Sequence, residues 1–149
     1  TGPSDIEQGR TMTAPLIEKL ISEHGYPEVS LANHDEFIAR PGMNVLFFPG
    51  DTKTVRDATD VAVVLPELAA TFEGRLSPGV VTDVFGDGKM LKRHYGFREH
   101  PALVFVRSGE YVGTITRIQD WGYYLEKINA LFTASPRRPP GFSVPVVSA

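Results

Sequence analysis

The chain has 149 residues, of which 42% are hydrophobic and 22% charged, and this length suits one domain with one hydrophobic core. Its formal net charge of -3 argues against a general nucleic-acid-binding protein, because such proteins are usually basic. The absence of cysteine excludes disulfides, zinc–thiolate sites, iron–sulfur ligation and cysteine nucleophiles from this chain.

The N-terminal third is predicted to hold a polar arm and short elements. Residues 1–14 are polar and lack the apolar stretch of a secretory signal, so we expect a flexible arm. Apolar residues at helical spacing begin at Pro15. The expected elements are a helix from Pro15 to His24–Gly25, an extended segment over 26–31, and a short helix capped by Asn33 or Asp35 and ending at Arg40.

The middle of the chain alternates between strand and helix patterns. The dense apolar run over 44–48 is typical of a strand covered on both faces. Pro66 lies inside the next helical pattern and should kink it. The expected elements are a strand over 44–48, a helix over 58–72, a turn over 74–79, a strand over 80–85 and a short helix ending at Tyr95.

The last third predicts a hairpin, a helix and a tail. Strands over 102–107 and 111–116 flank a tight connection at 108–110. Asp120 is expected to cap a helix that runs through Phe132. Residues 133–149 are rich in proline and are expected to form a mobile tail, which leaves one domain over 15–132. The order of elements predicts an α/β fold with a mixed sheet between helices.

The segment 95–110 resembles the part of the thioredoxin family in which a helix ends in Tyr-Gly and leads through a proline into an apolar strand and a Gly-Glu turn. That proline is typically cis, and the resemblance assigns this role to Pro101. The resemblance extends over roughly residues 28–132. It implies a thioredoxin-like fold with an extra N-terminal helix, and it places the two family cysteines at Ala58 and Val61. Without a thiolate, no mixed disulfide forms at those positions.

A narrower resemblance is to the HyaE and HupG hydrogenase-expression proteins, a branch of that superfamily without the redox pair. The segment 97–105, with Phe-Arg before the proline and Ala after it, and the helix entry at 118–121 carry this similarity. It implies an accessory protein for [NiFe] hydrogenase assembly, without enzymatic activity or cofactor, which binds the small-subunit precursor and its twin-arginine signal peptide in the cytoplasm.

Candidate binding residues cluster, in sequence, around the end of the predicted sheet. Carboxylates could meet the arginines of a signal peptide, and a groove beside the proline could take its apolar part. The candidate residues are Asp51, Asp57, Asp60, Glu99, His100 and Pro101, with Pro49 beside the groove. Simpler interpretations stay open: Asp57 as a helix N-cap, and His100 as a surface residue next to a turn.

Other patterns carry little chemistry. The four histidines have no metal-ligand spacing, so no metal site is expected. The Gly86-Asp87-Gly88 sequence is interpreted as a turn, because it lacks the lysine and hydroxyl of a phosphate loop. Helical spacing favours core packing for Trp121 and Tyr124, with a partner-binding anchor as the alternative. Two hypotheses remain, an assembly chaperone and a scaffold subunit of a larger complex, whereas a peroxiredoxin-like or glutathione-dependent enzyme is disfavoured.

Overall fold

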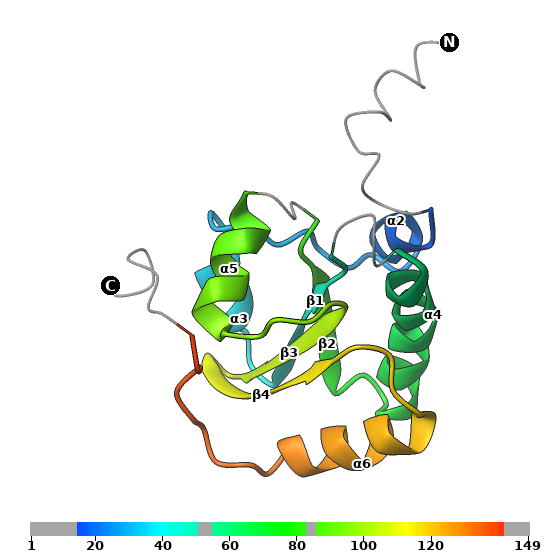
Figure 1. Cartoon of the computed structure of the whole chain (residues 1–149). Helices are drawn as coiled ribbons and strands as arrows, with labels where there is room; N and C mark the ends of the chain where they lie inside the picture. The colour runs from blue at the N-terminus through cyan, green and yellow to red at the C-terminus, as the bar shows by residue number, and fades with distance from the viewer. Residues whose placement is uncertain (1–14, 51–54, 83–85, 142–149) are drawn as a thin grey trace.

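The computed structural model describes residues 15–50, 55–82 and 86–141, and Figure 1 shows a sheet with helices on both of its sides. The expectations for residues 1–14 and 142–149 lie outside the described residues. The elements in chain order are α2 (Pro15–Ser22), α3 (His34–Ile38), β1 (Met43–Phe48), α4 (Val55–Thr71), β2 (Leu76–Val80), α5 (Asp87–Tyr95), β3 (Ala102–Arg107), β4 (Glu110–Thr116) and α6 (Trp121–Leu131).

The four strands lie in the order β2-β1-β3-β4. The β1–β2 pair is parallel, whereas β1–β3 and β3–β4 are antiparallel. The extended segment expected over 26–31 lies along the outer edge of β2, where Glu28 forms a parallel bridge with Val80. A parallel crossover through α4 followed by an antiparallel hairpin gives the predicted thioredoxin-like α/β fold.

The position of β2 corrects the sequence prediction. A turn was expected over 74–79, with the strand starting at residue 80, yet β2 already pairs with β1 from Leu76. The N–H and the C=O of Val80 both form hydrogen bonds with the outer segment. Because the backbone groups of successive residues in a strand point in alternating directions, the nitrogen of Pro78, two residues earlier, also points away from β1. Gly79 is needed because a Cβ there would lie 2.7 Å from the ring of Phe37. Residues 83–85 of the predicted strand lie outside the described residues.

The two faces of the sheet bury separate apolar clusters, and β1 is buried along its whole length, as its apolar run predicts. Alternate β1 side chains enter opposite clusters. One cluster lies against α2, α4 and α6, and its members from those helices include Ile17, Leu20, Leu65, Leu68, Tyr124 and Ile128. The other lies against α3 and α5 and includes Phe37, Leu91 and Tyr95.

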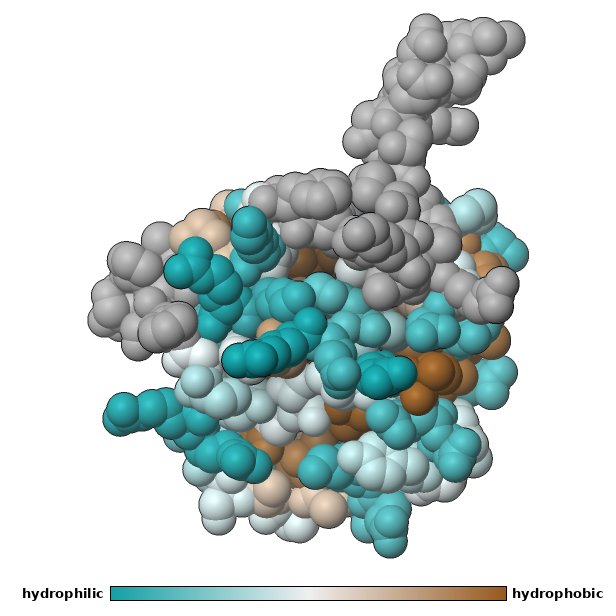
Figure 2. All heavy atoms as spheres, in the orientation of Figure 1, coloured by the Kyte–Doolittle hydropathy of each residue, from teal (hydrophilic) through white to brown (hydrophobic). Residues whose placement is uncertain are grey.

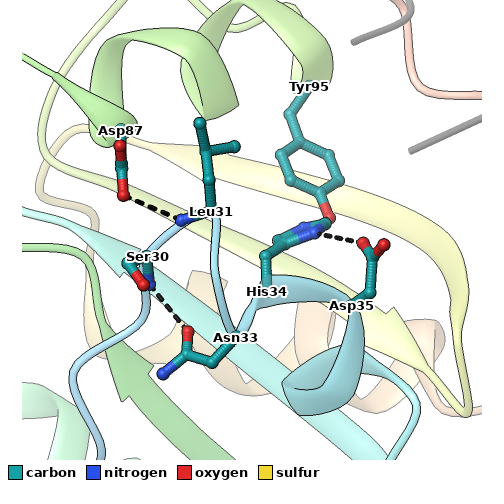
Figure 3. Close-up of polar contacts among 7 residues, drawn as sticks. All are labelled: Ser30, Leu31, Asn33, His34, Asp35, Asp87 and Tyr95. Carbon is teal, nitrogen blue, oxygen red and sulfur yellow. Dashed lines mark hydrogen bonds and ion pairs between the residues drawn. The ribbon is translucent and has the colours of Figure 1, made fainter. Parts of the chain in front are cut away.

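The predicted caps occupy their positions but work differently. Asn33 and Asp120 are the N-cap residues of α3 and α6, yet neither side chain makes a capping hydrogen bond. Asn33 Oδ1 instead accepts from the backbone N–H of Ser30 at 2.8 Å (Figure 3), and its amide donates to the Glu28 carbonyl. Asn33 therefore holds the turn that precedes α3.

The described part of the predicted mobile tail contacts the domain. The Arg107 guanidinium donates to the carbonyls of Leu131, Phe132 and Ala134 at 2.6–3.0 Å. The N–H of Arg137 donates to the Tyr111 carbonyl at 2.9 Å, which adds a hydrogen bond at the free edge of β4. Residues 133–141 thus lie along β4 toward α5, as the orange and red trace in Figure 1 shows.

Candidate functional site

The candidate site lies where β1 ends and β3 begins. Phe48 pairs with Ala102, so the segment after Phe48 and the loop before Ala102 meet at one end of the sheet. The His100–Pro101 peptide bond in that loop is cis, which is the form predicted for it, and Pro101 is buried. We call Pro49, Asp57, Asp60 and residues 99–101 the sheet-end site.

The loop over 99–101 is tied to the segment that follows β4. The N–H of Arg117 donates to the Pro101 carbonyl at 2.6 Å. The Arg117 guanidinium also lies 3.4 Å from the Glu99 carboxylate, and both side chains are more than half exposed. An exposed pair of this kind contributes at most about 1 kcal/mol, so either charge is readily exchanged for a partner's charge.

His100 lies over an apolar floor. Its ring packs edge-on against Phe97 with centroids 5.6 Å apart, and Phe97 packs against Phe48 at 4.8 Å. A hollow of about 10 Å³ lies between His100, Phe48, Gly50, Val81 and Gly88. This volume admits about one water molecule, and the groove expected beside Pro101 stays a prediction.

Two of the three predicted acids on the α4 side are placed by the structure. Asp57 is half-buried in the first turn of α4, and Asp60 is exposed three residues later on the same helix face. The helix begins at Val55, so the interpretation of Asp57 as the N-cap is wrong. The negative charge of Asp57 in the first turn still interacts favourably with the partial positive charge at the helix N-terminus. Asp51 lies outside the described residues.

Core residues occupy the two positions to which the thioredoxin resemblance assigns cysteines. Ala58 and Val61 are both about 1% exposed and belong to the cluster that packs on α2 and α6. In place of thiols, these two positions therefore have aliphatic side chains that are buried in the core.

The sequence analysis missed an exposed apolar pair where the chain passes from β4 into α6. Ile118 is 38% exposed and Trp121 is 40% exposed. Both follow shortly in sequence after Arg117, whose N–H donates to the Pro101 carbonyl. Core packing was favoured for Trp121 and Tyr124, and this holds only for Tyr124, which is buried and whose hydroxyl accepts from the Gln119 N–H. Trp121 is the first residue of α6 and lies one turn before Tyr124, the first buried residue of that helix. This position in the first turn is the sequence signal that could have predicted the exposure of Trp121.

A polar cluster between α3 and α5 was also missed. His34 is 1% exposed and contacts Asp35 at 2.9 Å through Nδ1 and the Tyr95 hydroxyl at 2.6 Å through Nε2 (Figure 3). Since a carboxylate only accepts, Nδ1 carries the proton and Nε2 accepts from Tyr95. Burial lowers the pKa of His34, an effect that Asp35 opposes, and burial raises the pKa of Tyr95. This neutral pair links α3 to α5.

Within the described part of the chain, no three histidine, aspartate or glutamate side chains gather as metal ligands. In these same ranges, no helix combines the length and apolarity needed to cross a bilayer.

Comparison with known proteins gives consistent results. The family model described as "Hydrogenase-1 expression protein HyaE" matches residues 16–124. The hydrogenase expression/formation protein HoxO of Azotobacter vinelandii is 37% identical over 92% of this chain and 89% of its own length. HupG of Bradyrhizobium diazoefficiens is 41% identical over 85% of this chain and 84% of its own. A crystal structure described as HupG from Rhodopseudomonas palustris is 40% identical, covers 70% of this chain and 93% of that one, and has a TM-score of 0.47.

Proposed function

The chain belongs to the HyaE family of hydrogenase expression proteins and has a role in hydrogenase expression and formation, and we propose that it serves this role as a non-enzymatic chaperone. It binds the precursor of the [NiFe] hydrogenase small subunit together with its twin-arginine signal peptide. Since such a peptide is bound before export, the protein acts in the cytoplasm.

The observation that carries the proposal is the composition of the sheet-end site and of the segment that follows β4. Asp57 and Asp60 lie in the first two turns of α4, which follows β1, and the exposed Ile118 and Trp121 follow Arg117, whose N–H donates to the Pro101 carbonyl. A twin-arginine peptide presents two guanidinium groups followed by an apolar stretch. Carboxylates bind guanidinium groups through charge-assisted hydrogen bonds, and exposed aromatic and aliphatic side chains gain free energy when a partner covers them.

The absence of chemistry supports a binding role over a redox one. The chain has no cysteine, and the positions where the resemblance places thiols are closed by Ala58 and Val61. A chaperone needs surface complementarity and no nucleophile. The remaining alternative is a scaffold subunit, which would contact mature hydrogenase components and would not distinguish a precursor from its processed form.

The test is a titration of the small-subunit precursor into purified wild-type protein and into the Asp57→Lys/Asp60→Lys variant, at low and moderate salt. We expect the variant to associate more slowly and to lose most of the salt dependence of association, because complementary charges steer the encounter. The matched control is Glu67→Lys/Glu126→Lys, which makes the same change of net charge at exposed positions on α4 and α6.

A second variant probes the apolar half of the site. His100→Arg places a larger, positively charged side chain over Phe97 next to Pro101, and we expect it to weaken equilibrium binding more than the acid reversals do. If both site variants bind the precursor like the control at both salt concentrations, the recognition surface lies elsewhere and the assignment of the site is wrong.

A further inference from the structure

A pocket of about 400 Å³ opens beside the C-terminal half of α5. Its cationic residues are Lys89, Lys92 and Arg93 from α5 and Arg98 from the following loop. Its apolar floor is the ring of Phe97, and residues 140–141 form the far wall. Figure 2 shows hydrophilic side chains gathered over α5 and the loop after it. The volume falls in the range of pockets that bind ligands or peptide side chains.

The wall of the pocket depends on two glycines. Gly96 ends α5 in the left-handed conformation, with φ of 76°, and its N–H donates to the Lys92 carbonyl. Gly96 and Gly141 pack backbone against backbone, since a Cβ on either would overlap the other's main chain. The pocket is therefore shaped by close backbone packing.

The charged residues among the described lining of this pocket are all positive. Four cationic side chains surround the opening, and no carboxylate belongs to the described lining residues. The ammonium of Lys92 lies 5.9 Å from the Phe97 ring centroid, so charge and apolar surface adjoin within the pocket. This composition fits a ligand that carries negative charge next to an apolar group.

The orientation of α5 decides between two kinds of anion. The pocket lies at the helix C-terminus, where the Arg93 and His94 carbonyls face Gly141. Compact phosphate groups favour helix N-termini, where free N–H groups point at the ligand, whereas the C-terminus carries partial negative charge. Separate carboxylates can each meet a long cationic side chain without approaching those carbonyls. We propose that this pocket binds an acidic segment of a partner polypeptide, with an apolar side chain of that segment on Phe97.

The pocket and the sheet-end site adjoin with opposite charge. The Phe97 ring that forms the pocket floor also contacts the ring of His100. A partner that spans both therefore has one orientation, with its acidic segment at α5 and its basic segment at α4. The pocket proposal goes beyond the proposed function and does not depend on the identity of that partner.

The test uses a fluorescein-labelled peptide of sequence Glu-Glu-Phe-Glu-Glu, its Gln-Gln-Phe-Gln-Gln analogue, and inorganic phosphate as a competitor. Binding is followed by anisotropy and by amide chemical shifts of the full chain in NMR. We expect saturable binding of the acidic peptide with the shifts concentrated at residues 89–98. We expect at least about 3-fold weaker binding of the glutamine analogue and of Lys89→Glu/Arg98→Glu, because each lost exposed pair is worth up to about fivefold.

The matched control is Lys19→Glu/Lys127→Glu, with the same change of net charge on α2 and α6, and it should bind like the wild type at equal salt. Equal loss in both double variants would show attraction by net charge alone and would overturn the proposal. Competition by millimolar phosphate at constant ionic strength, or shifts located away from α5, would overturn it as well.

Discussion

The buried pair of His34 and Tyr95 gives a stability prediction with a defined magnitude. Tyr95→Phe removes the hydroxyl that donates to His34 Nε2 at 2.6 Å and leaves a buried ring nitrogen without that hydrogen bond. Leaving a buried acceptor unsatisfied costs about 1–3 kcal/mol of unfolding free energy. Urea unfolding at pH 7.5 measures this loss, with Tyr123→Phe on the exposed face of α6 as the matched control, expected within about 0.5 kcal/mol of wild type.

The same histidine sets a pH dependence. Because burial lowers the pKa of His34 in the folded state, the unfolded state binds its proton first as the pH falls. The stability is therefore complete above the unfolded pKa, near 6.5, and declines below it until the pH reaches the lower folded pKa. One such group contributes a slope of at most about 1.4 kcal/mol per pH unit.

His34→Gln should flatten that part of the stability profile between pH 7 and 5, after comparison with wild type under the same conditions. Asp35→Asn should deepen it, because Asp35 is the group that holds the pKa of His34 up. An unchanged profile in His34→Gln, or a Tyr95→Phe loss no larger than that of Tyr123→Phe, would refute the reasoning about this cluster.

Three further predictions follow from the composition and the packing. Purified protein should not reduce insulin above the rate of the dithiol alone, because the chain has no sulfur nucleophile; a measurable excess would contradict this. Arg107→Ala should lower the unfolding free energy by about 1–3 kcal/mol in urea, because three carbonyls at the end of α6 and just after it lose the guanidinium as a donor. A chain ending at Ser135 should stay folded, with Tm lower by about 5 °C or less in calorimetry, since the described residues 136–141 contribute one backbone hydrogen bond and the Gly141 contact; a much larger drop would show that the segment supports the core.

Much of the fold follows from local patterns. The apolar run of β1, the hairpin of β3 and β4, and the helix after Asp120 were predicted within a residue or two, because burial on both faces and turn residues leave clear signals. The β2 strand was misplaced because Pro78 and Gly79 have the composition of a turn. Gly79 is needed in the strand because of its packing against Phe37, and Pro78 is tolerated because β2 lies at an edge of the sheet. Both reasons depend on tertiary contacts that the local sequence does not show.

The site was predicted in its parts and not in its surroundings. The sequence predicted where Pro101 and the acids of α4 lie relative to the strands, because these positions are local, whereas their role in binding stays a prediction. It missed the exposure of Trp121, which shares the helical spacing of the buried Tyr124 and differs only in lying at the start of α6. It also missed the basic pocket, because α5 and residues 140–141 meet only in the folded chain.

The most direct measurement is the affinity of the purified chain for the hydrogenase small-subunit precursor with its signal peptide and for the same subunit without it. The chaperone account predicts saturable binding of the precursor, and binding at least about tenfold weaker after removal of the signal peptide, a difference of about 1.4 kcal/mol. Equal affinity for both forms, or no binding of the precursor, would contradict the account and favour a scaffold subunit.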